Sequence, residues 1–252
     1  MRRILTAFVL IPSVIYTIFF GPELLFQLVV AVLAFLCFHE FAAIAAAQGI
    51  PVPLWLGEVL GLVFLLAPIT DWRLLLAITM LLMVWSLRTG TLSDSLPLAS
   101  ATLLGILYVY GSWRCAPVLR AASPWWLMFA VSLNWVGDSA ALYVGKALGK
   151  HKLAPVISPQ KTWEGAIGSA IFTTIYGVVL LTWSVQAKVL DAALLSFAAC
   201  AAGQVGDLAE SALKRGAGVK DSGTMLPGHG GWLDRLDSTL FSMPVVAFYL
   251  SA

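Results

Sequence analysis

Residues 24–46 read LLFQLVVAVLAFLCFHEFAAIAA, an apolar run that only Gln27, His39 and Glu40 interrupt. A helix needs roughly 20 such residues to cross the hydrocarbon core of a bilayer, so this run is long enough to span one. Hydrophobic residues make up 60% of the 252-residue chain and charged residues only 11%. This composition excludes an ordinary water-soluble domain and disordered or collagen-like chains. The three cysteines lie far apart without CxxC spacing, which excludes a disulfide framework and a thiolate metal site.

Eight further apolar runs follow the same pattern between turn and charge signals. Together they predict an all-α, polytopic integral membrane protein with about nine transmembrane helices. We place these helices at 5–20, 24–46, 54–69, 74–87, 96–113, 125–143, 163–183, 189–213 and 236–251. Several runs are short for a span, so a merged or re-entrant pair stays open. The first run begins with basic residues but lacks a small-residue cleavage site, so we expect it to be retained.

The distribution of basic residues predicts how the chain is oriented. With nine spans, eleven of the 15 lysines and arginines fall on one side and four on the other. Cytoplasmic ends of membrane helices carry the excess of Lys and Arg. We therefore expect location in the cell (cytoplasmic) membrane, the N-terminus inside and the C-terminus outside. The two basic segments, 144–162 and 214–235, would then place a polar active site at the cytoplasmic face.

The chain is expected to form a single membrane-embedded domain over residues 1–252, because its length is taken up by spans with short connections and leaves no space for a separate soluble domain. Residues 1–130 are almost purely apolar and predict a helical scaffold. Most later ionisable residues crowd into two segments, so we assign the chemistry to residues 131–252. No repeat or internal symmetry of the kind found in many transporters is evident.

The most informative polar stretch runs from Asp207 to Asp237. Asp207, Ser211 and Lys214 recur at i, i+4 and i+7, so they share one face of a helix. Asp234 and Asp237, at i and i+3, share a face of the following helix. A glycine-rich loop lies between the two faces and can bring backbone close to a ligand.

These two acidic faces predict a site for a metal and a polyphosphate. Carboxylates are the hard oxygen ligands that Mg²⁺ prefers, whereas a single histidine gives zinc too few ligands. We predict Asp207, Asp234 and Asp237 as the metal ligands. The cations expected to neutralise phosphate charge are Lys214, Arg215, Lys220 and Arg235. A solvated loop is the alternative, but carboxylates inside apolar helices at the membrane edge are costly and usually functional.

The second polar segment covers residues 138–165. Asp138 lies within an apolar run, and Thr162 precedes the run from Trp163, which indicates a helix start. The segment has no Walker A spacing. Its predicted substrate-binding residues are Asp138, Lys146, Lys150, Ser158, Lys161, Thr162 and Glu164. The alternative function, an anchor for anionic lipid headgroups, is compatible with this one, because an enzyme acting on an anionic lipid needs such a surface.

Three further ionisable residues are interpreted as structural. His39 and Glu40 are expected to form a helix-end pair that faces water. Glu58 lies between Gly57 and Gly61, so a GxxxG pattern predicts close helix packing with this carboxylate turned inward.

The run from Ser211 to Asp237 has the pattern S-x-L-K-R-x4-K-D-x-G-x2-L-P-x-H-G-G-x2-D-R-x-D. It resembles the signature of the phosphatidate cytidylyltransferase family. The ISP and KTWEG elements of residues 138–165 look like that family's other polar block, and the resemblance extends over the full length. Trp232 and Gln160 depart from the usual pattern, and neither is a proposed metal ligand.

The resemblance implies that CTP and phosphatidate react to give CDP-diacylglycerol and pyrophosphate with Mg²⁺. It also implies a second, monovalent cation and a homodimer, and we expect no nucleic-acid partner. In that reaction Asp207, Asp234 and Asp237 would bridge phosphate oxygens through metal. The residues assigned to catalysis are Ser211, Lys214, Arg215, Lys220, Asp221, His229 and Arg235. His229 would position a phosphate or help a proton to leave.

Two other functions stay open from the residues alone. A CTP-dependent polyprenol kinase would share the acidic and basic loops but transfer the γ-phosphate to a lipid alcohol, with His229 as a base. An ion-coupled transporter would use Asp138 and Asp207 along an ion path. A CDP-alcohol phosphotransferase is disfavoured because its DGxxAR pattern is absent.

Overall fold

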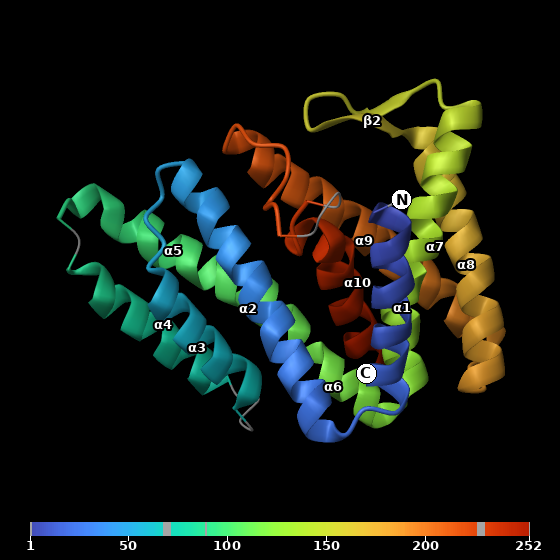
Figure 1. Cartoon of the computed structure of the whole chain (residues 1–252), viewed down its shortest axis with the longest axis horizontal. Helices are drawn as coiled ribbons and strands as arrows, with labels where there is room; N and C mark the ends of the chain where they lie inside the picture. The colour runs from blue at the N-terminus through green and yellow to red at the C-terminus, as the bar shows by residue number, and fades with distance from the viewer. Residues whose placement is uncertain (1, 68–71, 89, 226–229, 252) are drawn as a thin grey trace.

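The computed structural model describes residues 2–67, 72–88, 90–225 and 230–251, with side chains from residue 10 onward. Long helices form most of this structure (Figure 1). In chain order, the earlier elements are α1 (Arg2–Phe19), α2 (Glu23–Ala47), α3 (Leu54–Leu66), α4 (Trp72–Ser86), η1 (Leu92–Asp94), α5 (Ser95–Gly105), the π-helical η2 (Ile106–Gly111) and α6 (Cys115–Ala122). The later elements are α7 (Pro124–Leu148), β1 (Lys152–Ala154), β2 (Ser158–Thr162), α8 (Trp163–Ser184), α9 (Val189–Gly216) and α10 (Leu233–Ser251).

Within the described residues, five helical segments are long and apolar enough to cross a membrane. They are Glu23–Ala47, Leu92–Ala122, Pro124–Leu148, Trp163–Ser184 and Val189–Gly216. Leu10–Phe19, Leu54–Leu66 and Trp72–Ser86 are shorter apolar helices. The prediction of an all-α membrane protein is thereby confirmed, while the number of nine spans and their orientation stay predictions. The helix expected to end at residue 113 is followed directly by α6, and segment 144–162 contains an antiparallel hairpin that pairs Lys152 with Thr162.

The helices form two groups with α2 between them (Figure 1). The helices α3, α4 and α5 pack on one side of α2, and α7, α8, α9 and α10 pack against one another on the other side. The helix α2 contacts members of both groups, including α9 and α10. The polar segments therefore meet a helix from the early part of the chain.

Small residues let aromatic rings approach the helix backbone in the first group. The predicted GxxxG packing is found, since Gly57 lies against Phe38 of α2 and Gly61 against Tyr110 of η2. A Cβ added at Gly61 would lie 2.1 Å from the Tyr110 ring, which is fully buried. The Glu58 carboxylate between the glycines is largely buried and lies 3.6 Å from His39 Nδ1. Together, the glycine contacts and the Glu58–His39 pair place α3 against both α2 and η2.

Local sequence also sets the starts of the helices that surround the polar segments. The side chain of Ser123 accepts a hydrogen bond from Trp125 N at the start of α7, where Pro124 occupies the first turn. Thr162 caps α8 by accepting from Gly165 N at 3.1 Å. The helix start predicted at Thr162 is confirmed.

Gly61→Ala should lower the free energy of unfolding by about 1–3 kcal/mol, because the added methyl overlaps a ring that cannot move into solvent. Gly111→Ala is the matched control, since a Cβ there would meet Phe64 at an ordinary 3.5 Å. The measurement is thermal unfolding of the detergent-solubilised protein. Equal midpoints for Gly61→Ala and Gly111→Ala would contradict the packing.

Candidate active site

A cavity of about 370 Å³ lies between α7, α8, α9 and the β hairpin. Its lining includes five of the residues predicted to carry chemistry, namely Asp138, Ser158, Lys161, Thr162 and Asp207. Most other lining residues are apolar or small. Residues of the second polar segment and Asp207 of α9 therefore meet at one cavity.

Lys161 and Asp207 form an ion pair in this cavity. The Lys161 Nζ lies 2.5 Å from Asp207 Oδ2, and the two side chains are 26% and 29% exposed. Asp138 interacts electrostatically with Asp207, Lys161 and Arg235. Each carboxylate of the cavity therefore has a cation nearby, and solvent reaches the Lys161 pair.

Buried amide contacts hold α7 in place beside α10. Asn134, one helical turn before Asp138, donates to Ala130 O at 3.1 Å, to Thr239 Oγ1 at 3.2 Å and to Ser242 Oγ at 2.9 Å. A Cβ at Gly203 of α9 would lie 2.6 Å from Asn134 Oδ1, so glycine permits α9 to come this close. These contacts fix the position from which Asp138 enters the cavity.

Asp237 lies beside the cavity, since its neighbour Ser238 is part of the lining. Its side chain is buried, and Oδ1 accepts from Ser238 N at 2.6 Å. It interacts electrostatically with Asp207, Glu210 and Asp138. Asp237 on α10 and Asp207 on α9 therefore lie near each other, while the metal site expected from the two acidic faces stays a prediction.

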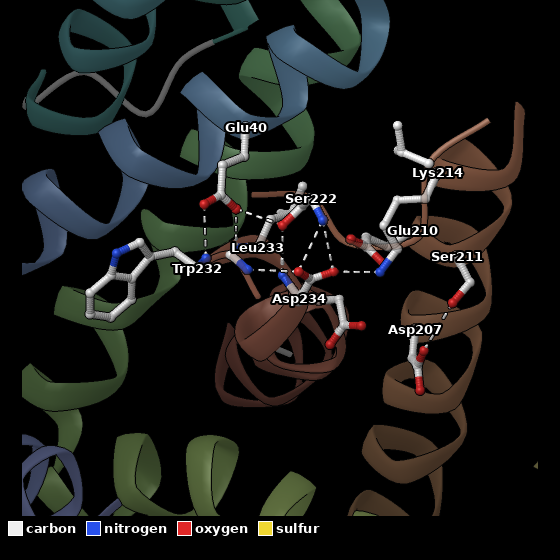
Figure 2. Close-up of polar contacts among 12 residues, drawn as sticks. Glu40, Asp207, Glu210, Ser211, Lys214, Ser222, Trp232, Leu233 and Asp234 are labelled. Carbon is white, nitrogen blue, oxygen red and sulfur yellow. Dashed lines mark hydrogen bonds and ion pairs between the residues drawn. The ribbon is translucent and has the colours of Figure 1, made fainter. Parts of the chain in front are cut away.

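Lys214 lies between two carboxylates in a second, more buried cluster (Figure 2). Its Nζ is 2.6 Å from Glu210 Oε2 and 2.5 Å from Asp234 Oδ1, and its side chain is 10% exposed. The carboxylate of Asp234 also accepts from Ser222 N at 3.0 Å and from Gly231 N at 2.8 Å. In this structure Lys214 and Asp234 fasten the loop between α9 and α10, and their predicted phosphate and metal roles stay predictions.

The charge state of Asp234 follows from these contacts. Burial alone would raise the pKa of Asp234, but the hydrogen bonds from Lys214, Gly231 and Ser222 outweigh it and hold this pKa below its usual value. The side chain therefore stays ionised near neutral pH, as a partner for Lys214 must.

Glu40 belongs to this cluster, and the prediction that it faces water is wrong. It is 3% exposed, and its oxygens accept from Ser222 Oγ at 2.7 Å, Trp232 N at 3.0 Å and Leu233 N at 2.8 Å (Figure 2). Only the adjacent His39 is substantially exposed. The signal for Glu40 was present in the sequence, because a carboxylate inside an apolar helix must find buried donors.

The remaining predicted residues are spread around these two clusters. Ser211 donates to Asp207 Oδ1 at 3.4 Å, and Arg215 donates to the carbonyl oxygens of Ile157 and Val219. Glu164 accepts from His151 Nδ1 at 2.6 Å if that nitrogen carries the proton. The exposed members of the predicted set are Asp138, Lys146, Lys150, Arg215, Lys220, Asp221 and Arg235. His229 lies outside the described residues.

The carboxylates around the cavity fit a magnesium ion shared with a substrate. Mg²⁺ commonly binds one or two protein carboxylates and takes its other ligands from phosphates and water. Asp138 and Asp207 line the cavity and Asp237 lies beside it. Over the described ranges of the chain, no group of three or more His, Cys, Asp or Glu side chains is placed to hold a metal ion.

Comparison with known proteins identifies several similar sequences. The chain is 45% identical over 127 residues to the phosphatidate cytidylyltransferase of Bacillus subtilis (strain 168), which covers 50% of this chain and 47% of the relative. It is 40% identical over 148 residues to the phosphatidate cytidylyltransferase of Staphylococcus haemolyticus (strain JCSC1435), covering 58% of this chain and 54% of the relative.

Haemophilus influenzae has a third such relative, also named phosphatidate cytidylyltransferase, 41% identical over 128 residues, or 49% of this chain and 44% of the relative. The chain spans about half the length of the curated relatives it matches. The model of the Cytidylyltransferase family matches it over residues 1–252. Because that match includes both polar segments and the helices that carry them, the chain belongs to the cytidylyltransferase family.

Proposed function

We propose that this protein is a phosphatidate cytidylyltransferase, which forms CDP-diacylglycerol and pyrophosphate from CTP and phosphatidate. Family membership and the names of its relatives support a cytidylyl transfer. The observation that carries the proposal is the meeting of Asp138, Asp207 and Lys161 in one cavity. Carboxylates beside a cation, in a helical membrane protein, suit a reaction between a nucleoside triphosphate and an anionic lipid.

The proposed reaction depends on positioning the two substrates more than on activating a nucleophile. A phosphate monoester has a second pKa near 6, so a phosphatidate oxygen is largely ionised at neutral pH and can attack the α-phosphate of CTP without a dedicated base. The protein has to hold two polyanions in line and stabilise the leaving pyrophosphate. Lys161 and Arg235, the cations that interact with Asp138, would neutralise phosphate charge at the cavity.

We propose Asp207 and Asp237, with Asp138 beside them, as the carboxylates that hold Mg²⁺. A bound Mg²⁺ would neutralise charge on the phosphate oxygens and on the leaving group. Lys161, now paired with Asp207, would turn to a phosphate when the nucleotide enters. Asp234 would hold the loop through Lys214 rather than serve as a ligand.

The orientation in the membrane is also part of the proposal. The basic segments support a site that opens to the cytoplasm, where CTP is available, with the N-terminus inside and the C-terminus outside. The homodimer and the monovalent cation rest on the family resemblance alone.

CTP labelled separately at the α- and γ-phosphates distinguishes the proposed reaction from its rivals. With detergent-purified protein, phosphatidate and Mg²⁺, the α label should enter the lipid while pyrophosphate is released. Entry of the γ label into an added lipid alcohol would support a lipid kinase instead. Absence of CTP turnover under all these conditions would contradict both enzymes and favour the transporter.

Asp237→Asn and Asp207→Asn should each lower turnover roughly 100-fold or more, because each removes a carboxylate proposed to hold the Mg²⁺ that would neutralise phosphate charge. The control is Asp191→Asn, which changes a carboxylate in the first turn of α9, at the other end from Asp207. Initial rates would be measured across a range of Mg²⁺ concentrations on protein with an unchanged unfolding midpoint. Near-normal Mg²⁺-dependent rates in both cavity variants would defeat the ligand assignment.

A further inference from the structure

The start of α10 is capped by a side chain from the opposite end of the sequence. Glu40 of α2 accepts from the backbone N–H groups of Trp232 and Leu233, the residues at which α10 begins. The first N–H groups of a helix have no partner within the helix, and the positive end of the helix dipole favours an anion there. Glu40 therefore meets both requirements of this helix end.

Ser222 connects this cap to the buried cluster. Its hydroxyl donates to Glu40 Oε2 at 2.7 Å and accepts from Asp234 N at 3.3 Å, so it satisfies the next N–H of α10. Its own N–H donates to the Asp234 carboxylate. Two carboxylates, one from α2 and one from α10, thus hold Ser222 and the start of α10 together (Figure 2).

Glycines in the loop leave room for the Glu40 carboxylate. A Cβ at Gly231 would lie 2.2 Å from Glu40 Oε2, and a Cβ at Gly223 would lie 2.6 Å from Oε1. The backbone can therefore approach Glu40 from both sides. A buried carboxylate without donors is costly, and these contacts supply the hydrogen-bond donors that Glu40 needs inside the fold.

We propose that Glu40 is a positioning residue for cytidylyl transfer: it fixes the start of α10 and thereby the placement of Asp237 beside the cavity. This inference rests on the proposed function. Asp237 lies one turn beyond Asp234 on α10, so a shift or fraying of the first turn would move it relative to Asp207. The segment 1–130, expected to be only a scaffold, would then contribute directly to the geometry of the site.

The test compares Glu40→Gln, which keeps the size of the side chain but removes its charge and one acceptor, with the wild type. Loss of a residue that supports a metal ligand typically costs 10–100-fold in metal affinity or activity. We expect kcat to fall by about 10-fold or more and the Mg²⁺ concentration for half-maximal rate to rise. Hydrogen exchange of residues 230–240, measured without substrates, should become faster. His39→Gln is the matched control, and its kinetics should match the wild type.

Each result bears on the inference. If folded Glu40→Gln keeps the kcat and the Mg²⁺ requirement of the wild type, the inference is overturned. It is also overturned if kcat falls only together with the unfolding midpoint while the Mg²⁺ requirement stays unchanged. If Glu40→Gln does not fold, Ser222→Ala decides in its place, because it removes only the hydroxyl. A raised Mg²⁺ requirement at an unchanged unfolding midpoint would support the inference, and wild-type kinetics would overturn it.

The proposed function is tested independently of this inference. A wild-type protein without cytidylyl transfer would refute the reaction, while the exchange of residues 230–240 would still report whether Glu40 holds α10. Unchanged exchange in Glu40→Gln would overturn the positioning role whatever the reaction is.

Discussion

The contact between Lys214 and Asp234 links the two helices on which the polar site is built. Both side chains are buried, and removing one partner of a buried ion pair typically costs 3–5 kcal/mol because the other charge is left unpaired. The pair joins the end of α9 to the start of α10, and Glu210 on α9 and two loop N–H groups complete its shell. With this contact in place, Asp207 lines the cavity from α9 and Asp237 lies beside it on α10.

Two lysines of the polar segments differ in burial, and therefore in how readily each can exchange a carboxylate partner for a phosphate. Lys161 is paired with Asp207 at the cavity, where both side chains are about a quarter exposed. A pair that water reaches is weak and can exchange one partner for a phosphate. Lys214 is held by two carboxylates away from solvent, so exchange there would leave buried charges without partners. Lys161 is thus the more exposed of the two ion-paired lysines, and Lys214 is the one that joins α9 to the start of α10.

Much of this arrangement can be predicted from sequence, because its signals are local. Apolar runs predict the helices, Thr162 predicts the start of α8, and the i, i+4 spacing puts Ser211 beside Asp207. The partner of Glu40 could not be predicted, since Ser222 lies 182 residues away and sequence spacing carries no information on that contact. Asp234 shows a related limit: its i, i+3 spacing from Asp237 predicts a metal ligand, but the N–H donors of Ser222 and Gly231 around it depend on how the loop folds.

In the proposed site, Asp207 and Asp237 hold the metal while Asp234 holds the loop. A structure of the protein with Mn²⁺ and a non-reactive CTP analogue, with the metal located by its anomalous scattering, tests this most directly. The account predicts a metal at about 2.0–2.3 Å from oxygens of Asp207 and Asp237, typical of a small divalent cation. Lys161 should then contact a phosphate and Lys214 should remain on Asp234. A metal bound to Asp234 with Lys214 displaced would contradict the account.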